Sequence, residues 1–280
     1  MRVMTWNLWG RFGPWRTRAE AIAATMAEVQ PDVCGLQEVW SAGERNFAAD
    51  LAERLGPQWR WAMSTPTPTR QDPEVGGGNA ILSRWPILGV AQMPLPVPDD
   101  DPGGRVALHA RIETPGGVLP MFTTHLTHHP YASQNRVEQV RRLAEFVAKH
   151  TAGPEHRASP EDASDNDSDY PPVLTGDLNA APDSDEIRLL SGMLTAPAVA
   201  RQVLVDAWRY ASPADPGFTV DRRNGHRTAQ TGPDARIDYI LAGLLPRRGR
   251  GRVRTVRLAG NAPVNGMWPS DHFAVVADLG

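Results

Sequence analysis

Residues 173–179 read Val-Leu-Thr-Gly-Asp-Leu-Asn, an apolar strand that runs directly into an aspartate and an asparagine. The first residues suit a buried strand, whereas Asp177 and Asn179 are costly to bury without partners. Polar side chains also mark the places where other strands meet loops, at Asn7, Gln37-Glu38, Thr124-His125, Arg236–Tyr239 and Ser270–His272. A fold that gathers the ends of distant strands into one cleft explains this distribution, which is typical of an active site.

The composition is that of a folded protein. The chain has 280 residues, of which 41% are hydrophobic, and a formal net charge of -3. This charge gives no global attraction to nucleic acid, although a local basic cleft is compatible with it. The single cysteine, Cys34, lies in an apolar run, which excludes an internal disulfide and indicates a buried thiol. No stretch approaches the ~18 apolar residues of a membrane span and no signal peptide is recognisable, so we expect a cytoplasmic protein.

The hydrophobic pattern predicts many strands and few long helices. Helices are expected over 17–29, 47–55, 133–149, 184–193 and 203–210. Strands are expected over 2–8, 33–39, 59–63, 79–83, 87–93, 106–113, 119–124, 173–175, 237–242, 253–258 and 273–278. Because strands and helices do not alternate regularly, we expect antiparallel or mixed sheets covered by helices, in a single domain over residues 1–280.

Two segments are predicted to lack regular structure. The segment 66–78 is rich in proline and glycine and is predicted to be a loop, with its run Gly76–Gly78 as a flexible turn. The acidic segment 152–170 contains little that is apolar, so we interpret it as a flexible surface insertion.

Four carboxylates adjoin apolar strands: Glu38, Asp177, Asp238 and Asp271. Any one of them alone is satisfied most simply by an arginine or by backbone amides. Four together, each beside an asparagine, glutamine or histidine at a strand end, favour a shared cation. Carboxylate and amide oxygens suit a hard ion such as Mg²⁺, Mn²⁺ or Ca²⁺, whereas zinc would require more imidazole or thiolate.

The imidazoles and amides complete a set of groups for phosphoryl transfer. A cleft carboxylate such as Asp238 would hold the ring of His272 in one tautomer and stabilise its charged form. His125 is the second imidazole, although taken alone it fits a hydrogen-bonded histidine at a sheet edge equally well. Asp177 would orient or deprotonate an attacking water, and Asn179 would hold that water or a phosphate oxygen.

The ordered motifs resemble the endonuclease/exonuclease/phosphatase superfamily. They are W-N at 6–7, L-Q-E-V at 36–39, N-A-I-L-S-R at 79–84, T-T-H-L at 123–126, G-D-L-N at 176–179, R-I-D-Y-I at 236–240 and S-D-H-F at 270–273. Each motif is weak alone, but the ordered set spans almost the whole chain and is specific. The resemblance implies a four-layer α/β/β/α sandwich with its site at one rim.

The resemblance also implies the metal ligands and the residues that handle water. Glu38 is the principal Mg²⁺ ligand by this likeness, with Asn7 and Asp271 nearby. Asp177 aligns the nucleophilic water, and Asn179 supports it.

The remaining implied roles concern the phosphate. By the same likeness, His272 contacts the scissile phosphate and pairs with Asp238. His125 stands where deoxyribonuclease- and sphingomyelinase-like members carry a histidine and apurinic-site enzymes a tyrosine. Arg105 is a candidate phosphate contact. Asn224, in an arginine-rich loop, is a further candidate for facing the substrate.

The substrate stays open, since specificity in such a fold lies in its loops. We expect a monomeric phosphodiesterase, with nucleic acid as one candidate substrate. The alternatives are a phosphomonoesterase acting on a phosphoinositide or small phosphorylated metabolite, and a non-catalytic interaction module. Trp9, Phe12 and Trp15 either contact substrate or, as we favour, cap the sheet end. The arginine-rich stretch 246–257 is interpreted as a solvated hairpin rather than a phosphate-binding stripe.

Overall fold

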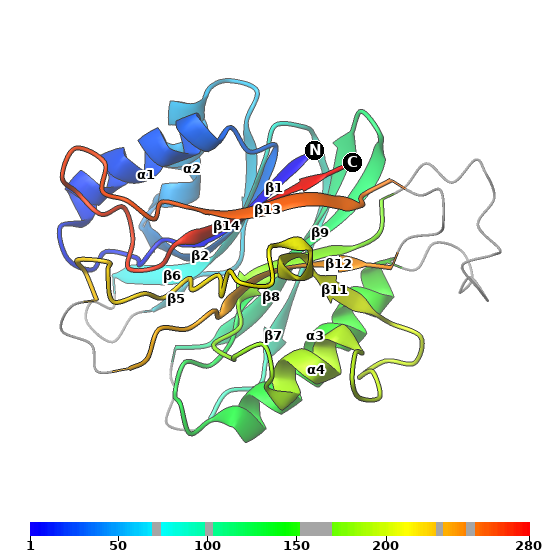
Figure 1. The fold of residues 1–280 in the computed structure, drawn as a ribbon. Helices are drawn as coiled ribbons and strands as arrows, with labels where there is room; N and C mark the ends of the chain where they lie inside the picture. The colour runs from blue at the N-terminus through cyan, green and yellow to red at the C-terminus, as the bar shows by residue number, and fades with distance from the viewer. Residues whose placement is uncertain (69–73, 99–102, 152–169, 228–231, 245–249) are drawn as a thin grey trace.

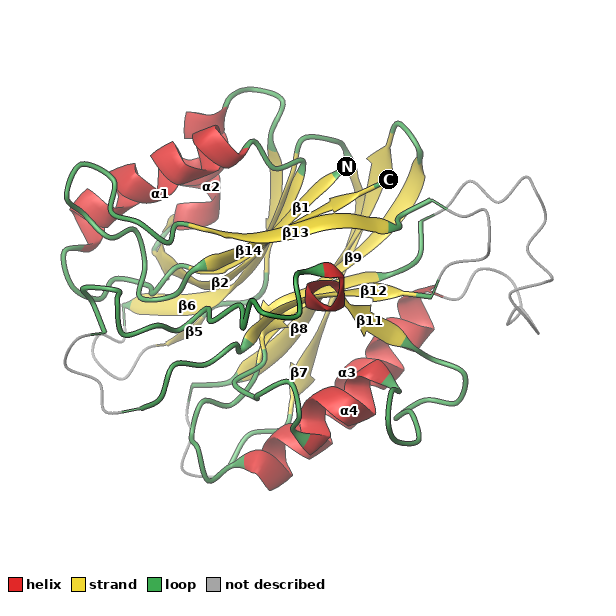
Figure 2. Cartoon of the chain, in the orientation of Figure 1, coloured by secondary structure: helices red, strands yellow, loops and turns green. Residues whose placement is uncertain are grey.

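The computed structural model describes residues 1–68, 74–98, 103–151, 170–227, 232–244 and 250–280. Two β-sheets pack face to face. Helices α1 (Trp15–Val29) and α2 (Phe47–Leu55) cover one sheet, and α3 (Ser133–Thr151) and α4 (Asp185–Ser191) cover the other (Figure 1). Figure 2 shows the same four layers by type of secondary structure. The predicted α/β/β/α sandwich is therefore confirmed.

Parts of three predicted features lie outside the described residues. These parts are residues 69–73 of the predicted loop 66–78, residues 152–169 of the acidic segment and residues 246–249 of the arginine-rich stretch. Within the described ranges, no helix combines the length and the apolar character needed to cross a membrane.

Both sheets are mixed. The first has the order β13 (Val253–Ala259), β14 (Ala274–Leu279), β1 (Arg2–Asn7), β2 (Val33–Ala42), β6 (Val75–Ser83) and β4 (Arg60–Met63), with β3 (Arg45–Asn46) on β2 and β5 (Thr67–Pro68) on β6. The second has the order β11 (Leu204–Asp206), β12 (Asp238–Gly243), β10 (Val173–Asp177), β9 (Gly117–His125), β8 (Arg105–Thr114) and β7 (Ile87–Leu95). The pairs β1–β2 and β9–β10 are parallel, and the other named pairs are antiparallel.

The strand register brings the predicted site residues together. Asp177, the last residue of β10, lies opposite His125, the last residue of β9, and opposite Asp238, the first residue of β12. In the other sheet Asn7 lies opposite Gln37 on β2. Parallel neighbours end at the same edge of a sheet, so the polar residues that follow each apolar run meet at one rim.

The space between the sheets changes character toward that rim. Elsewhere it is filled by apolar side chains such as Val3, Val33 and Ile81. Near the site, Gln37 Nε2 donates a hydrogen bond of 2.9 Å to Thr123 Oγ1, which joins the two sheets, and one of 3.2 Å to Thr5 Oγ1 within its own sheet. Buried polar groups paired in this way resist displacement, because breaking one bond leaves an unsatisfied partner.

Two expectations about local structure are wrong. The range 203–210 was predicted to be helical, but it forms β11 followed by the 3₁₀ helix η2 (Ala207–Tyr210). Pairing of β11 with β12 and an ion pair of 2.7 Å between Asp206 and Arg236 outweigh the local helical pattern. The run Gly76–Gly78 was predicted to be a turn, but it belongs to β6 and pairs with Val39–Ser41 of β2.

Candidate active site

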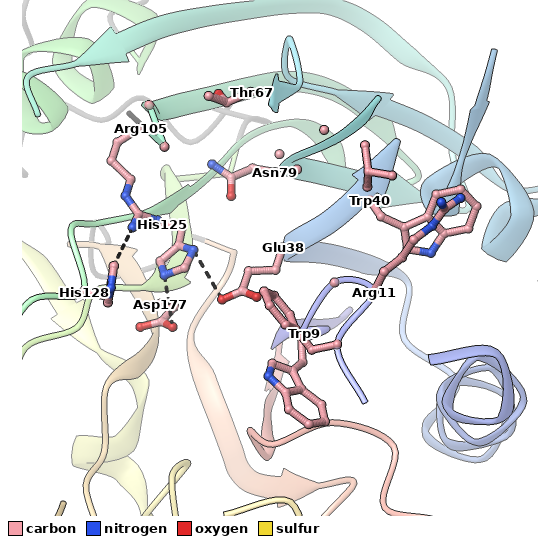
Figure 3. Close-up of a pocket in the computed structure, with 18 of the residues that line it drawn as sticks. Trp9, Arg11, Glu38, Trp40, Thr67, Asn79, Arg105, His125, His128 and Asp177 are labelled. Atoms are coloured by element: carbon pink, nitrogen blue, oxygen red, sulfur yellow. Dashed lines mark hydrogen bonds and ion pairs between the residues drawn. The ribbon is translucent and has the colours of Figure 1, made fainter. Parts of the chain in front are cut away.

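One end of the sandwich carries an open cleft of about 840 Å³. The cleft is lined from both sheets and from loops far apart in the sequence, and it includes Glu38, His125, Asp177, Asp271 and His272. Figure 3 shows Glu38, His125 and Asp177 pointing toward one another from different strands. The fold thus gathers most of the polar strand ends that mark the sequence.

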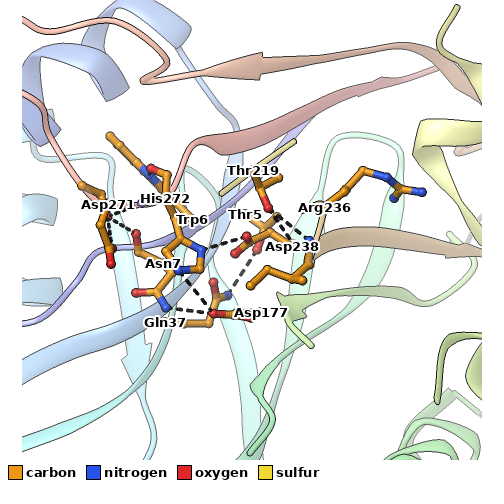
Figure 4. A network of polar contacts seen from close by, with 12 residues as sticks. Thr5, Trp6, Asn7, Gln37, Asp177, Thr219, Arg236, Asp238, Asp271 and His272 are labelled. Carbon is orange, nitrogen blue, oxygen red and sulfur yellow. Dashed lines mark hydrogen bonds and ion pairs between the residues drawn. The ribbon is translucent and has the colours of Figure 1, made fainter. Parts of the chain in front are cut away.

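Asp177 lies at the centre of this group and is 1% exposed. Its Oδ2 lies 3.5 Å from Nε2 of His125 (Figure 3). The same oxygen accepts a hydrogen bond of 3.0 Å from Asn7 Nδ2 and lies 3.8 Å from Nε2 of His272 (Figure 4). Burial, reinforced by repulsion from Asp238, raises the pKa of Asp177 to about 7. Asp177 therefore takes up and releases a proton near neutral pH, as a general base must.

His272 is a buried cation. Its Nδ1 and Oδ2 of Asp238 are 2.9 Å apart, which orients the ring and leaves Nε2 toward Asp177. Burial alone would lower the pKa of His272, but the carboxylates of Asp238, Asp271 and Asp177 together raise it well above its ordinary value. The backbone of Asp238 is itself fixed, because its N–H donates to Thr219 Oγ1 at 3.3 Å.

His125 is the neutral counterpart of His272. Burial, followed by the nearby positive charges of Arg105, His272 and His128, lowers the pKa of His125 well below its ordinary value. Its Nδ1 lies 4.0 Å from Oε1 of Glu38 and its Nε2 lies 3.5 Å from Oδ2 of Asp177. A neutral imidazole carries one N–H donor and one acceptor nitrogen, so His125 lies between the two acids without adding charge.

Arg105 lies at the rim of the cleft. Its Nη2 is 3.1 Å from Nδ1 of His128, and both side chains line the cleft (Figure 3). The rings of His128 and His129 are in contact at a tilted angle, with centroids 4.1 Å apart. His128 is exposed and His129 is half-buried, and both rings form part of the cleft wall.

Glu38 and Asp271 fit a divalent cation. Both line the cleft. Burial, and then the neighbouring Asp271 carboxylate, raise the pKa of Glu38. Two carboxylates that repel each other provide hard oxygen ligands, and a bound cation would relieve their repulsion.

A second acidic group competes as a metal site. Among the acids and histidines in the described ranges, Asp177, Asp238 and His272 bring ligand atoms within 4.8 Å of one another. However, Nδ1 of His272 is hydrogen-bonded to Asp238, which leaves only Nε2 of that ring for a cation. Glu38 and Asp271 offer carboxylate oxygens alone, the ligands that a hard divalent cation prefers, which favours them.

Asn7 braces the acidic residues. Its Nδ2 donates to Oε1 of Glu38 and to Oδ2 of Asp177, each at 3.0 Å. Its Oδ1 accepts a 2.9 Å hydrogen bond from the backbone N–H of Trp9. Asn7 therefore positions two carboxylates. Its own Oδ1, the atom that would bind a metal, already accepts the hydrogen bond from Trp9.

Asn179 and Asn224 differ in their relation to the cleft. Asn179 lines it, and its backbone N–H donates to Oδ1 of Asp177 at 3.0 Å. Asn224 is fully buried and is not among the lining residues. Its Nδ2 donates to the backbone oxygen of Ser270 at 2.8 Å, so it supports the segment that carries Asp271 rather than facing substrate as we expected.

Arg18, which the sequence does not single out, holds two walls of the site together. This α1 side chain is 1% exposed and donates to the backbone oxygens of Leu8, Trp9, Gly10, Phe12 and Pro269 at 2.8–3.3 Å. It thereby ties the loop after β1 to the segment before Asp271. In sequence Arg18 resembles any surface arginine of an amphipathic helix, so no local signal identifies it.

Comparison with known proteins agrees with this architecture. The chain is 26% identical over 209 residues to a Drosophila melanogaster protein named "Putative neutral sphingomyelinase", covering 68% of this chain and 41% of that one. It thus spans less than half the length of that relative.

Solved structures share the fold over the whole chain. An endonuclease/exonuclease/phosphatase from Beutenbergia cavernae is 25% identical with a TM-score of 0.69, covering 100% of this chain and 71% of that one. D. rerio TDP2 complexed with single-strand DNA product is 19% identical with a TM-score of 0.73, covering 100% and 98%. The sequence model of the Endonuclease/Exonuclease/phosphatase family matches residues 4–272. The chain therefore belongs to the endonuclease/exonuclease/phosphatase family, whose members hydrolyse phosphate esters.

Proposed function

We propose that this protein is a metal-dependent phosphodiesterase in which Asp177 activates water and His272 stabilises the charge on the phosphate. The observation that carries the proposal is the juxtaposition of Asp177 Oδ2 and His272 Nε2, 3.8 Å apart. The pKa of Asp177 is about 7, so it accepts a proton near neutral pH. The pKa of His272 is raised well above its usual value, so its imidazole stays cationic there. A base beside a cation suits in-line attack of water on a phosphate.

Asp177 and the residues around it can accept the proton of the attacking water and donate a hydrogen bond to the phosphate. A water that hydrogen-bonds to Asp177 and Asn179 loses a proton to the Asp177 carboxylate as its oxygen attacks phosphorus. Nε2–H of His272 donates to a phosphate oxygen while the ester oxygen departs. Asp238 keeps the ring oriented through the 2.9 Å contact with Nδ1. Neutral His125 contributes hydrogen bonding without a second cation.

The proposed metal ligands are Glu38 and Asp271, with Asn7 as the residue that holds Glu38 in place. A bound divalent cation supplies charge neutralisation at the phosphate and at the leaving oxygen. Mg²⁺ is the proposed ion, because the ligands are oxygens, and Mn²⁺ and Ca²⁺ satisfy the same chemistry.

A diester is favoured over a monoester by the shape of the cleft. The lining continues on both sides of Glu38, toward Arg105 and His128 in one direction and toward Trp40 and Arg11 in the other (Figure 3). A phosphodiester carries a group on each side of phosphorus, and both sides need room. A monoester would leave one arm of the cleft empty.

The test is hydrolysis of bis(p-nitrophenyl) phosphate and of p-nitrophenyl phosphate, each with Mg²⁺, Mn²⁺ or Ca²⁺, by the wild-type protein and by Asp177→Asn. We expect hydrolysis of the diester by the wild-type protein and its loss in Asp177→Asn with the fold retained. Preference for the monoester would instead establish a phosphomonoesterase. If neither ester is hydrolysed and no metal shifts the melting temperature, the non-catalytic alternative holds.

A further inference from the structure

The cleft extends beyond the catalytic residues to an arginine held between two indole rings. The Arg11 guanidinium carbon lies 4.1 Å from the ring centroid of Trp40 and 4.7 Å from that of Trp15. All three residues line the same cleft as Asp271 and His272. Figure 3 shows Arg11 and Trp40 on the opposite side of Glu38 from Arg105 and His128.

The two indoles hold the guanidinium in place without satisfying its hydrogen-bonding groups. Trp40 stacks on Phe47 and meets Trp15 edge to face, with centroid distances of 5.8 and 5.6 Å, so the aromatic walls are part of the core. Cation–π contact engages the faces of the guanidinium and leaves its N–H edge available. Nε of Arg11 is buried, and no hydrogen bond or ion pair joins Arg11 to the described residues.

Arg18 shows what a purely structural arginine looks like a few residues away. Its guanidinium donates to five backbone oxygens. Arg11, in contrast, combines a fixed position with unused donors. A planar guanidinium with a free edge matches two oxygens of a phosphate.

The floor of the cleft beside Trp40 is open above Gly77. Gly77 of β6 pairs with Trp40 and lines the cleft. A Cβ added at Gly77 would meet no atom within 4 Å, so the space above it is open. A large side chain at position 77 would therefore enter the cleft lining next to Trp40.

We propose that Arg11 binds a second, non-reacting phosphate of the substrate, so that the preferred substrates are phosphodiesters with another phosphate group nearby. This inference rests on the proposed phosphodiesterase function and narrows its substrate class. The acidic residues lie in the middle of the cleft, and the arginines lie toward its two ends. An ester with a single phosphate contacts only the catalytic residues in the middle of the cleft. A substrate with two phosphates contacts these residues and Arg11.

The test compares substrates that differ by one phosphate. Thymidine 5′-(p-nitrophenyl phosphate) is assayed with and without a 3′-phosphate, and so is a p-nitrophenyl phosphodiester of 1,3-propanediol with and without phosphate on its other hydroxyl. We expect the wild-type kcat/KM to be at least about 10-fold higher for the doubly phosphorylated member of a pair, chiefly through KM. The pair that shows the preference tells whether the second phosphate belongs to a nucleotide or to a small ester.

Three variants identify the residue responsible. Arg11→Gln should remove the preference, and Arg11→Lys should restore part of it, because a point charge lacks the planar fork. Gly77→Phe should also reduce it by filling the floor. Arg45→Gln is the control for overall charge, since the Arg45 side chain is 76% exposed and lies outside the cleft lining, so the preference should remain. An equal preference in wild type and Arg11→Gln would overturn the proposal.

The two proposals fail in different ways. If the wild-type protein hydrolyses none of these esters, the phosphodiesterase function fails, and calorimetry with thymidine 3′,5′-bisphosphate then tests Arg11 directly. Binding at least about 10-fold weaker in Arg11→Gln supports the phosphate subsite. Equal binding in wild type and variant overturns it.

Discussion

Two buried histidines of this protein respond to burial in opposite ways. His272 at the rim is 8% exposed and His109 in β8 is 2% exposed. The pKa of His272 is raised well above its ordinary value, whereas burial lowers the pKa of His109 to about 4. The same side chain is thus a cation at one position and neutral at the other.

The difference comes from the neighbours of each ring. Nδ1 of His109 is 3.1 Å from the backbone oxygen of Met121, its ring stacks on Phe122 at 4.4 Å, and its Nε2 has no hydrogen-bond partner in the described parts of the chain. His272 has a carboxylate 2.9 Å from Nδ1. Burial disfavours the charged imidazole in both places, and only nearby carboxylates reverse the effect. A buried histidine therefore becomes a functional cation only where the fold also delivers acids.

Removing His272 should have the largest effect. We expect His272→Ala to lower kcat/KM for bis(p-nitrophenyl) phosphate by about 10³-fold or more, because the variant lacks the cation that faces the developing phosphate charge. The melting temperature should change little compared with this loss. His150→Ala is the matched control, since it removes an imidazole outside the cleft lining. Near-normal turnover in His272→Ala would refute the site assignment.

Glu38→Ala tests whether the acids of the rim also hold the metal. We expect the affinity for Mg²⁺ or Mn²⁺, measured by calorimetry, to fall by about 100-fold, because the variant loses a direct oxygen ligand. Glu28→Ala, which removes an exposed acid of α1, should bind the metal as the wild type does. An unchanged metal affinity in Glu38→Ala would instead indicate that Asp177, Asp238 and His272 bind the metal.

Asp238→Asn should make His272 resemble His109. Because Asp238 is the strongest influence that raises the pKa of His272, its neutralisation should lower that pKa, as measured by NMR of ¹³C-labelled histidine. The ring would then be partly neutral at pH 7, and we expect kcat to fall by about 10²-fold. Asp234→Asn, at an exposed ion pair with Arg222, is the control. An unaltered His272 pKa would show that burial and the other carboxylates decide its charge.

The rim could be predicted from the sequence because each of its residues adjoins a recognisable strand. Asp177 follows an apolar run, and Asp271-His272 precedes one, so local pattern and fold agree on where they meet. The identity of the fold follows from the order of such segments. The sequence predicts the charged form of His272 through its pairing with Asp238, and the structure shows that pair. The neutral state of His109 could not be predicted, because its surroundings depend on contacts between β8 and β9.

Other features escape prediction for identifiable reasons. A run of glycines has no alternating side-chain pattern, so the β6 strand at Gly76–Gly78 resembles a turn until its pairing with β2 is known. β11 has three residues, which are too few for a periodic signal. Arg11 and Arg18 lie close together in sequence, and only the structure distinguishes the arginine with a free edge from the one that binds five carbonyl oxygens.

His109→Phe should have a smaller effect, visible only in the pH dependence of stability. The pKa of residue 109 is about 4 in the folded protein and about 6.5 in the unfolded chain, so the unfolded chain binds the extra proton between these values. The stability associated with neutral His109 is therefore complete above pH ~6.5 and is lost as the pH falls toward ~4. Phenylalanine cannot be protonated, so the variant should lose about 3 kcal/mol less free energy of unfolding than the wild type over this interval, as measured by urea denaturation at each pH. Parallel pH curves for the two proteins would mean that the His109 ring is protonated within the fold, and the contrast with His272 would then rest on the carboxylates alone.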